Sequence, residues 1–164
     1  MSKPRALSAE SGLNLRYANS KDNLLILDWR NNTDVRKYSR SREIIEQDIH
    51  DKWFTIRLAN MHLEPILIFS FQGKDFGMTR LDKASDSSST FEISILVDPD
   101  FQGRGFARMM ISQTLLLAQD SLAATELVAN IHRENLSSIG LFTNLDFHKT
   151  QNVKGQFEEF RIYL

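Results

Sequence analysis

A short turn between an apolar run and a helix-like run carries the residues best suited to binding an anion. The run 91–97 is strand-like, a helical pattern begins near Arg104, and the turn contains Gln102-x-x-Gly105-x-Ala107. Small residues let a backbone approach a ligand closely, and the first N–H groups of a helix have no partner inside it. With the positive end of the helix dipole, these groups predict a cradle for a pyrophosphate. The alternative is an ordinary strand-to-helix turn in which glycine serves only the geometry.

Hydrophobic periodicity predicts the elements that must position this turn. Along the strand before it, the odd-numbered residues share one face, while Glu92, Ser94 and Leu96 share the other. A helix is predicted from 44 to 59 because apolar residues, Ile49 and Ile56 among them, recur at helical spacing. The expected strands cover 13–17, 65–71, 75–81, 90–97, 127–131, 149–153 and 157–163, and the expected helices cover 24–30, 44–59, 104–119 and 134–145.

The chain is expected to form one domain over residues 13–164, preceded by a tail. Residues 1–12 are polar and contain a proline, which predicts a flexible segment. Turns are predicted over 34–38 and 72–74, and a longer serine-rich connection over 82–89. The length of 164 residues fits a single domain with a substantial core.

Composition excludes several classes of function. Twenty lysines and arginines oppose 21 aspartates and glutamates, and this balance disfavours nucleic acid or an anionic membrane as a partner. There is no cysteine, so disulfides and thiolate chemistry are excluded, and four scattered histidines predict no metal site. No apolar run approaches the roughly 20 residues of a membrane span, and the first residues lack a secretion signal. We therefore expect a cytoplasmic protein, either a monomer or a homodimer.

Other phosphate-binding motifs fit the turn poorly, whereas one acyltransferase motif fits it well. A nucleoside-triphosphate P-loop is missing, and Met109 and Met110 occupy the region where a dinucleotide fingerprint needs its third glycine. The turn instead resembles the Q/R-x-x-G-x-G/A motif of the GNAT-type N-acetyltransferases. A second segment, N-x-x-S-x-x-L-F-x-x-L-D-F over 135–147, resembles the N-x-x-A-x-x-L-Y-x-x-x-G-F segment of that family. The resemblance implies an α+β fold, a mostly antiparallel twisted sheet of about seven strands flanked by about four helices.

The resemblance also implies acetyl-CoA as the acyl donor, with no metal. Backbone amides of the turn would hold the CoA pyrophosphate, and the main chain of 95–97 would pair with the pantetheine amides, as an added strand would. Arg104 and Arg108 would meet phosphate charge or lie in solvent, and Asn135 would contact CoA or only begin a helix. The implied cofactor-binding residues are Ile95, Leu96, Val97, Gln102, Gly103, Arg104, Gly105, Phe106, Ala107, Arg108 and Asn135.

One position departs from the family pattern and affects the expected mechanism. Phe142 stands where many relatives have a tyrosine that protonates the leaving thiolate. A thiol with a pKa of about 8.5 leaves without a strong acid, so Ser138 and His132 are candidates for delivering the proton. Glu92 is the candidate general base for direct attack by the amine; a carboxylate of pKa about 4 would act through a water or after burial. The alternative is that Glu92 only pairs with a neighbouring cation.

The two early helices are expected to bind the acceptor amine. Their segments 28–36 and 50–54 resemble a subgroup that includes aminosugar-nucleotide N-acetyltransferases of the pseudaminic acid pathway. Both tryptophans could stack on a base or sugar, or could be core anchors, and Arg30 could pair with a diphosphate. The candidate acceptor residues are Trp29, Arg30, Asn31, His50 and Trp53.

The sequence is therefore compatible with three functions. The first is an N-acetyltransferase acting on a small-molecule amine, a nucleotide-linked aminosugar. The second is a protein or peptide N-terminal acetyltransferase, whose ribosomal-protein members share a looser tryptophan pattern. The third is a non-catalytic acyl-CoA-binding module, with which Phe142 is compatible.

Overall fold

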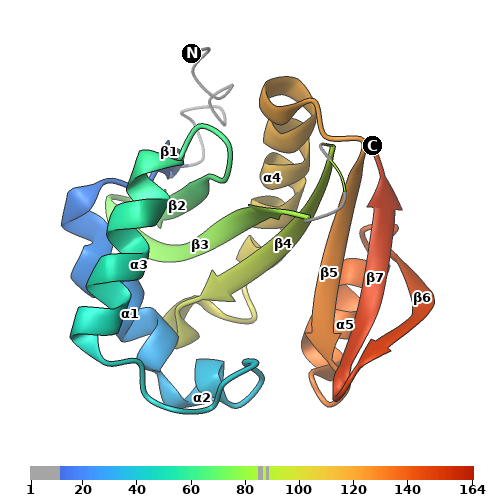
Figure 1. The fold of residues 1–164 in the computed structure, drawn as a ribbon, viewed down its shortest axis with the longest axis horizontal. Helices are drawn as coiled ribbons and strands as arrows, with labels where there is room; N and C mark the ends of the chain where they lie inside the picture. Colours follow the sequence, from blue (N-terminus) through green and yellow to red (C-terminus); the bar gives the residue numbers. More distant parts are fainter. Residues whose placement is uncertain (1–11, 85–86, 88) are drawn as a thin grey trace.

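One seven-stranded sheet organises the computed structural model, which describes residues 12–84, 87 and 89–164 (Figure 1). Its strand order is β1-β2-β3-β4-β5-β7-β6, and every pair is antiparallel except β4 with β5. The α+β class and the expected number of strands are thereby confirmed. The strands are β1 (Leu13–Tyr17), β2 (Ile66–Phe71), β3 (Lys74–Lys83), β4 (Thr90–Val97), β5 (Glu126–His132), β6 (His148–Lys154) and β7 (Phe157–Tyr163).

Helices cover both faces of this sheet. The α-helices are α1 (Asn23–Asn31), α2 (Thr33–Arg36), α3 (Gln47–Ala59), α4 (Phe106–Leu122) and α5 (Leu136–Thr143), and the short 3₁₀ helices are η2 (Ser20–Asp22) and η3 (Pro99–Phe101). In the described part of the chain, no helix is long and apolar enough to cross a membrane.

The alternation of side chains along β4 divides the core into two clusters. Phe91 and Ile93 are buried in a cluster that includes residues of α4 and α5. Leu96 points to the opposite face and packs in a second cluster with residues of α1 and α3. This is the alternation that the sequence predicts, because successive side chains of a strand point to opposite sides. The central strand is therefore fixed on both faces.

β4 and β5 are hydrogen-bonded over only a short stretch. Their parallel register pairs Thr90 with Glu126 and Glu92 with Val128, with one pair between them. Beyond Glu92 the strands separate, so the sheet opens like a V towards the end of β4 (Figure 1). On its other side β4 remains paired with β3 up to Val97. One edge of β4 therefore offers main-chain groups that no strand of the described chain pairs.

Helix α3 differs from the sequence prediction in its start and in its buried face. It begins at Gln47 instead of residue 44, and Ile49 and Ile56 are 60% and 65% exposed. The row of isoleucines that indicated the helix is therefore not the face that packs on the sheet. Polar side chains can take that face because they find partners in the interior. The buried residues of α3 are His50, Phe54 and Arg57.

Several other boundaries shift for local reasons. α4 begins at Phe106 instead of residue 104, because Gly105 adopts a left-handed conformation that a right-handed helix cannot include. α5 is shorter than the predicted 134–145 helix, and the short turn predicted over 34–38 overlaps α2, one helical turn over 33–36. The tail predicted for residues 1–12 lies outside the described residues apart from Gly12, and so do parts of the 82–89 connection.

Candidate active site

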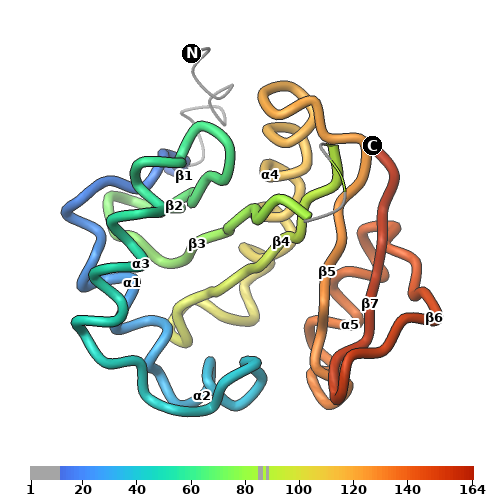
Figure 2. The backbone as a smooth tube through the Cα atoms, viewed as in Figure 1, coloured from blue at the N-terminus to red at the C-terminus, as the bar shows by residue number. Residues whose placement is uncertain are grey.

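A cavity of about 410 Å³ lies where β4 and β5 separate. Residues 92–96 of β4 and 129–132 of β5 form two of its walls, and α5 contributes a third. Residues of the segment 35–45 line the wide end of the V, where the tube in Figure 2 lies below the end of β4, beside the gap that separates it from β5. A volume of this size suits a small organic ligand. The cavity therefore exists because β4 and β5 are not hydrogen-bonded to each other beyond Glu92.

The turn before α4 has the geometry of an anion cradle. Gly103 and Gly105 have φ angles of +73° and +79°, values that other L residues rarely adopt. Nothing lies within 4 Å of the place where a side chain of either glycine would begin, so the space above the turn is open. The side chain of Gln102 turns back instead, and its Nε2 donates to the carbonyl of Val97 at 3.1 Å. The first N–H groups of α4 are thus left available to an anion.

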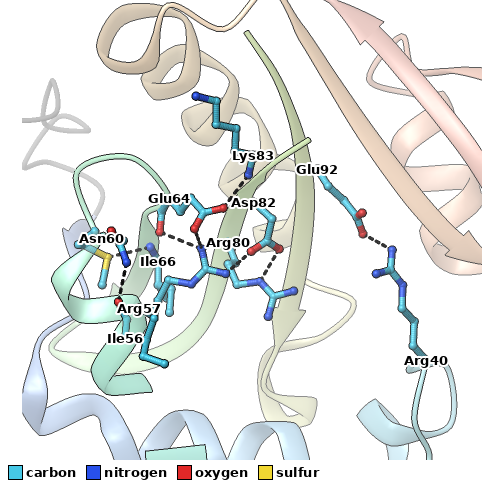
Figure 3. A network of polar contacts seen from close by, with 11 residues as sticks. Arg40, Ile56, Arg57, Asn60, Glu64, Ile66, Arg80, Asp82, Lys83 and Glu92 are labelled. Carbon is cyan, nitrogen blue, oxygen red and sulfur yellow. Dashed lines mark hydrogen bonds and ion pairs between the residues drawn. The ribbon is translucent and has the colours of Figure 1, made fainter. Parts of the chain in front are cut away.

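Glu92 lines the cavity and forms an ion pair. Its Oε1 lies 2.6 Å from Nη2 of Arg40, a residue of the segment that closes the cavity (Figure 3). The cation that the sequence left open as a partner of Glu92 is therefore present. Among the described residues no other side chain or amide donates to this carboxylate, so Oε2 can still accept from a ligand or water. The ion pair and a role as base are compatible.

The two candidate proton donors occupy the β5 side of the cavity. His132 is buried, and each of its ring nitrogens contacts a donor: Nη2 of Arg42 lies 3.3 Å from Nε2, and the amide of Glu134 lies 3.3 Å from Nδ1. A neutral imidazole accepts on only one nitrogen, so these contacts compete. Ser138 lines the cavity, and its hydroxyl makes no hydrogen bond with any residue described. Ser138 is therefore better placed than His132 to pass a proton.

The start of α5 holds the remaining residues of this wall. Oδ1 of Asn135 accepts from the amide of Ser138 at 3.2 Å, so the helix-start role considered for Asn135 is present, and the residue also lines the cavity. Phe142 lines the cavity too, with its ring edge-on to Phe147 at 4.9 Å between centroids. No phenolic hydroxyl is available at this position.

Comparison with known proteins identifies this arrangement. A model of the acetyltransferase (GNAT) domain matches residues 13–148. The chain belongs to the GNAT acetyltransferase family. It is an acetyl-CoA-dependent N-acetyltransferase, as the turn motif and the segment 135–147 led us to expect. No curated protein matches the chain.

Solved structures share the fold of this acetyltransferase at low sequence identity. Spermidine N-acetyltransferase from Vibrio cholerae, solved with CoA and spermine, is 20% identical with a TM-score of 0.80, over 94% of this chain and 95% of that one. Ribosomal-protein-alanine N-acetyltransferase from Brucella melitensis is 18% identical with a TM-score of 0.75, over 92% and 99%. An N-acetyltransferase from Staphylococcus aureus Mu50 is 23% identical with a TM-score of 0.76, over 93% and 99%. Likenesses at this level establish the fold.

Of the five residues predicted to bind the acceptor, only Arg30 lines the cavity of the acetyltransferase. Trp29 is buried and its Nε1 donates to Oδ2 of Asp98 at 3.2 Å, which ties α1 to the end of β4. The side chain of Asn31 donates to the carbonyl of Ile45 and accepts from its amide, at 2.9 and 2.8 Å. Asn31 thereby holds one end of the segment that closes the cavity.

The other two predicted acceptor residues lie behind Arg30. Burial lowers the pKa of His50, whose Nε2 contacts the carbonyl of Asn23 at 3.0 Å and whose Nδ1 has no partner among the described residues. Such a ring stays neutral and serves packing. Trp53 does not line the cavity, but its ring lies 4.8 Å from the guanidinium carbon of Arg30. Its connection to the cavity is this contact with Arg30.

Sequence reasoning missed the arginines that the fold brings to the cavity. Arg36, Arg40 and Arg80 line it, and Arg42 contacts His132 at its wall. A signal for Arg80 exists, since it is the one cation of the strand predicted over 75–81. The cluster of cations over 36–42 was a second signal, but nothing in the sequence alone placed it opposite β4.

Proposed function

We propose that this acetyltransferase transfers the acetyl group from acetyl-CoA to the primary amine of a small molecule that enters the cavity between β4 and β5. The observation that carries the proposal is the cavity itself, which brings Glu92, Ser138 and several arginines around a space of about 410 Å³. A pocket of this size accommodates a small ligand and provides groups for both proton transfer and recognition.

The donor would bind along two backbone surfaces. The amides from residue 102 to 107 would hold the pyrophosphate, and the unpaired edge of β4 beyond Glu92 would pair with the pantetheine arm. The left-handed glycines and the open space above them support this assignment. When bound, acetyl-CoA supplies a thioester carbonyl that an amine can attack.

Glu92 is the proposed general base for that attack. Its carboxylate faces the cavity and keeps one oxygen free of partners within the described chain, so it can accept a proton from the amine directly or through a water. Ser138 is proposed to relay a proton to the departing thiolate, since its hydroxyl is at the cavity wall and Phe142 has none. Backbone N–H groups near Leu96 and Val97 would stabilise the oxyanion.

A nucleotide-linked aminosugar is the first choice of acceptor. The cavity wall carries Arg30, Arg36, Arg40 and Arg80, against the two carboxylates of Glu43 and Glu92. An excess of cations attracts a substrate with phosphate groups and repels a polyamine, the substrate named for the Vibrio cholerae structure. A protein or peptide N-terminus is the second choice.

The test begins with a thermal shift of the protein with acetyl-CoA. Binding to the folded state alone stabilises it by about 2.7 kcal/mol at a hundredfold excess over the dissociation constant. Thiol release is then measured with a UDP-linked aminosugar, spermidine and an alanine-terminated peptide. Turnover highest with the sugar supports the proposal, and turnover confined to either of the other amines overturns the choice of acceptor. A shift without turnover on any amine would indicate an acyl-CoA-binding module.

A further inference from the structure

Three arginines surround the ring of Trp53 behind the cavity. The guanidinium carbons of Arg30, Arg80 and Arg57 lie 4.8, 5.7 and 5.8 Å from the ring centroid. They come from α1, β3 and α3, so the fold assembles the cluster from distant parts of the chain. Cations over an aromatic face are attracted to its electrons, which holds their guanidinium groups in place.

The carboxylates of this cluster do not balance its arginines. Arg57 pairs with Asp82 and with Glu64, and Nε of Arg80 lies 2.8 Å from Oδ2 of Asp82 (Figure 3). The guanidinium group of Arg30 makes no hydrogen bond or ion pair with any residue in the described part of the chain, and its contact there is with the ring of Trp53. Three guanidinium groups thus face two carboxylates. Burial, together with the nearby charge of Arg80, lowers the pKa of Arg30, which indicates that its positive charge is poorly compensated.

The excess charge faces the cavity. Arg30 and Arg80 both line it, whereas Arg57 does not. The register of the sheet places Arg80 opposite Ser94, whose side chain shares a face of β4 with Glu92. Two residues along a strand span about 7 Å. An anionic group held by these arginines would therefore lie roughly one sugar ring from the proposed base.

We infer that Arg30 and Arg80 form an oxyanion subsite, which holds a phosphate or carboxylate group of the acceptor while its amine faces Glu92. Guanidinium groups bind oxyanions through paired N–H donors, and Trp53 keeps that of Arg30 oriented. The inference rests on the proposed function, since it names the class of amine that the cavity takes. The preferred acceptors are amines with a negatively charged group, in contrast to polyamines.

A binding measurement tests the subsite without any need for turnover. Tryptophan fluorescence is followed during titration with inorganic pyrophosphate, in protein already saturated with CoA so that the cradle before α4 is occupied. Because Trp53 contacts both arginines, its emission should change, and the change should persist in Trp29→Phe. In Arg30→Gln the pyrophosphate affinity should fall about tenfold to a hundredfold, and in Arg30→Lys by less. Malonate in place of pyrophosphate distinguishes a carboxylate from a phosphate ligand.

Lys52→Gln is the matched control. Lys52 is an exposed cation next to Trp53 in the sequence, it pairs with Asp48, and it does not line the cavity. This variant removes the same charge from the protein and should titrate like the parent. Equal loss of affinity in Lys52→Gln and Arg30→Gln would show a diffuse charge effect and overturn the subsite. The absence of any fluorescence change with both anions would overturn it too.

Activity provides a second, independent readout. Glucosamine 6-phosphate and glucosamine differ only in the phosphate, and the ratio of their kcat/KM values reports its recognition. The ratio should favour the phosphate in the parent and fall about tenfold or more in Arg30→Gln. Equal use of both sugars by the parent, with CoA still bound, would overturn the subsite and leave the proposed acetyl transfer intact. If no amine is turned over, the proposed function fails, and the titration still decides whether the subsite exists.

Discussion

Glu92 and Arg40 form an ion pair at the wall of the cavity, with 2.6 Å between the carboxylate Oε1 and the guanidinium Nη2. The carboxylate belongs to the central strand, whereas the arginine belongs to the segment between α2 and α3 and its side chain is 63% exposed. An exposed ion pair contributes little to stability, about 0–1 kcal/mol. A ligand can therefore separate the two at small cost, which exposes the proposed base when the acceptor enters.

Replacing Glu92 tests its role as a base. Glu92→Gln keeps the size of the side chain but cannot take up a proton, so turnover should fall about 10²- to 10⁴-fold while acetyl-CoA affinity stays unchanged. Thiol release gives the rate and thermal shift gives the affinity. Glu43→Gln is the matched control, because Glu43 is the other carboxylate at the cavity. Activity equal to the parent's between about pH 6 and 9 would remove Glu92 from the mechanism.

A tryptophan in place of Gly105 should abolish acetyl-CoA binding. The side chain would fill the open space above the turn, and the φ of +79° adds backbone strain of about 1–2 kcal/mol. Gly155→Trp controls for that strain, since Gly155 has a φ of +62° and open space but lies in the far β6–β7 turn. The measurement is the thermal shift with acetyl-CoA. A normal shift in Gly105→Trp would show that the cradle lies elsewhere.

Removing the side chain of Asn31 should loosen the segment that closes the cavity. Its two hydrogen bonds to Ile45 contribute together about 1–3 kcal/mol to local stability. In Asn31→Ala, the amide of Ile45 should exchange its hydrogen faster and the KM for the amine should rise, with acetyl-CoA binding preserved. Asn60→Ala removes an exposed hydrogen bond at the end of α3 and serves as the control. Unchanged exchange at Ile45 would contradict this role.

Acid should weaken the β5–β7 half of the sheet through Glu159. A hydrogen bond from Arg161, helped by Asn152 and Thr150, lowers the pKa of this carboxyl from 4.5 to about 2. The unfolded chain therefore binds the proton first, so the stabilisation is complete above about pH 5 and is lost as pH falls towards 2. Because Arg161 is 33% exposed, we expect a loss of about 1–2 kcal/mol.

Urea unfolding at neutral and acid pH measures this loss. Glu159→Gln should be less stable than the parent at pH 7 and should lose less stability on acidification. Glu158→Gln is the control, since Glu158 pairs with the exposed Lys149. Identical pH dependence in Glu159→Gln and the parent would contradict the assignment.

Local patterns were sufficient to predict the turn before α4 and the strand β4, because both depend mainly on backbone conformation. Gly103 and Gly105 are required by the turn itself, and the alternation along Thr90–Val97 fixes which side chains face each cluster. The acceptor wall was less predictable. Trp29 and Asn31 have the chemistry of a binding site, but the fold uses their polar atoms to hold Asp98 and Ile45.

Residues distant in the sequence account for what the sequence could not reveal. Arg30 of α1 and Arg80 of β3 come together only because the fold places both guanidinium groups against the ring of Trp53. The buried face of α3 has the same origin. His50 and Arg57 are buried because they contact Asn23 and Asp82, which are distant in the sequence. The periodicity of apolar residues along the helix cannot predict such polar partners.

The two halves of the sheet share only three residue pairs between β4 and β5. Each half carries its own ladders, so a change in the angle of the V would break few hydrogen bonds. A donor that enters the V, pairs with the free edge of β4 and also contacts β5 would bridge the two halves as a removable strand. Binding of the donor should therefore make the angle between the two halves of the sheet more rigid. The rigidity of the sheet would then depend on whether the cofactor is bound.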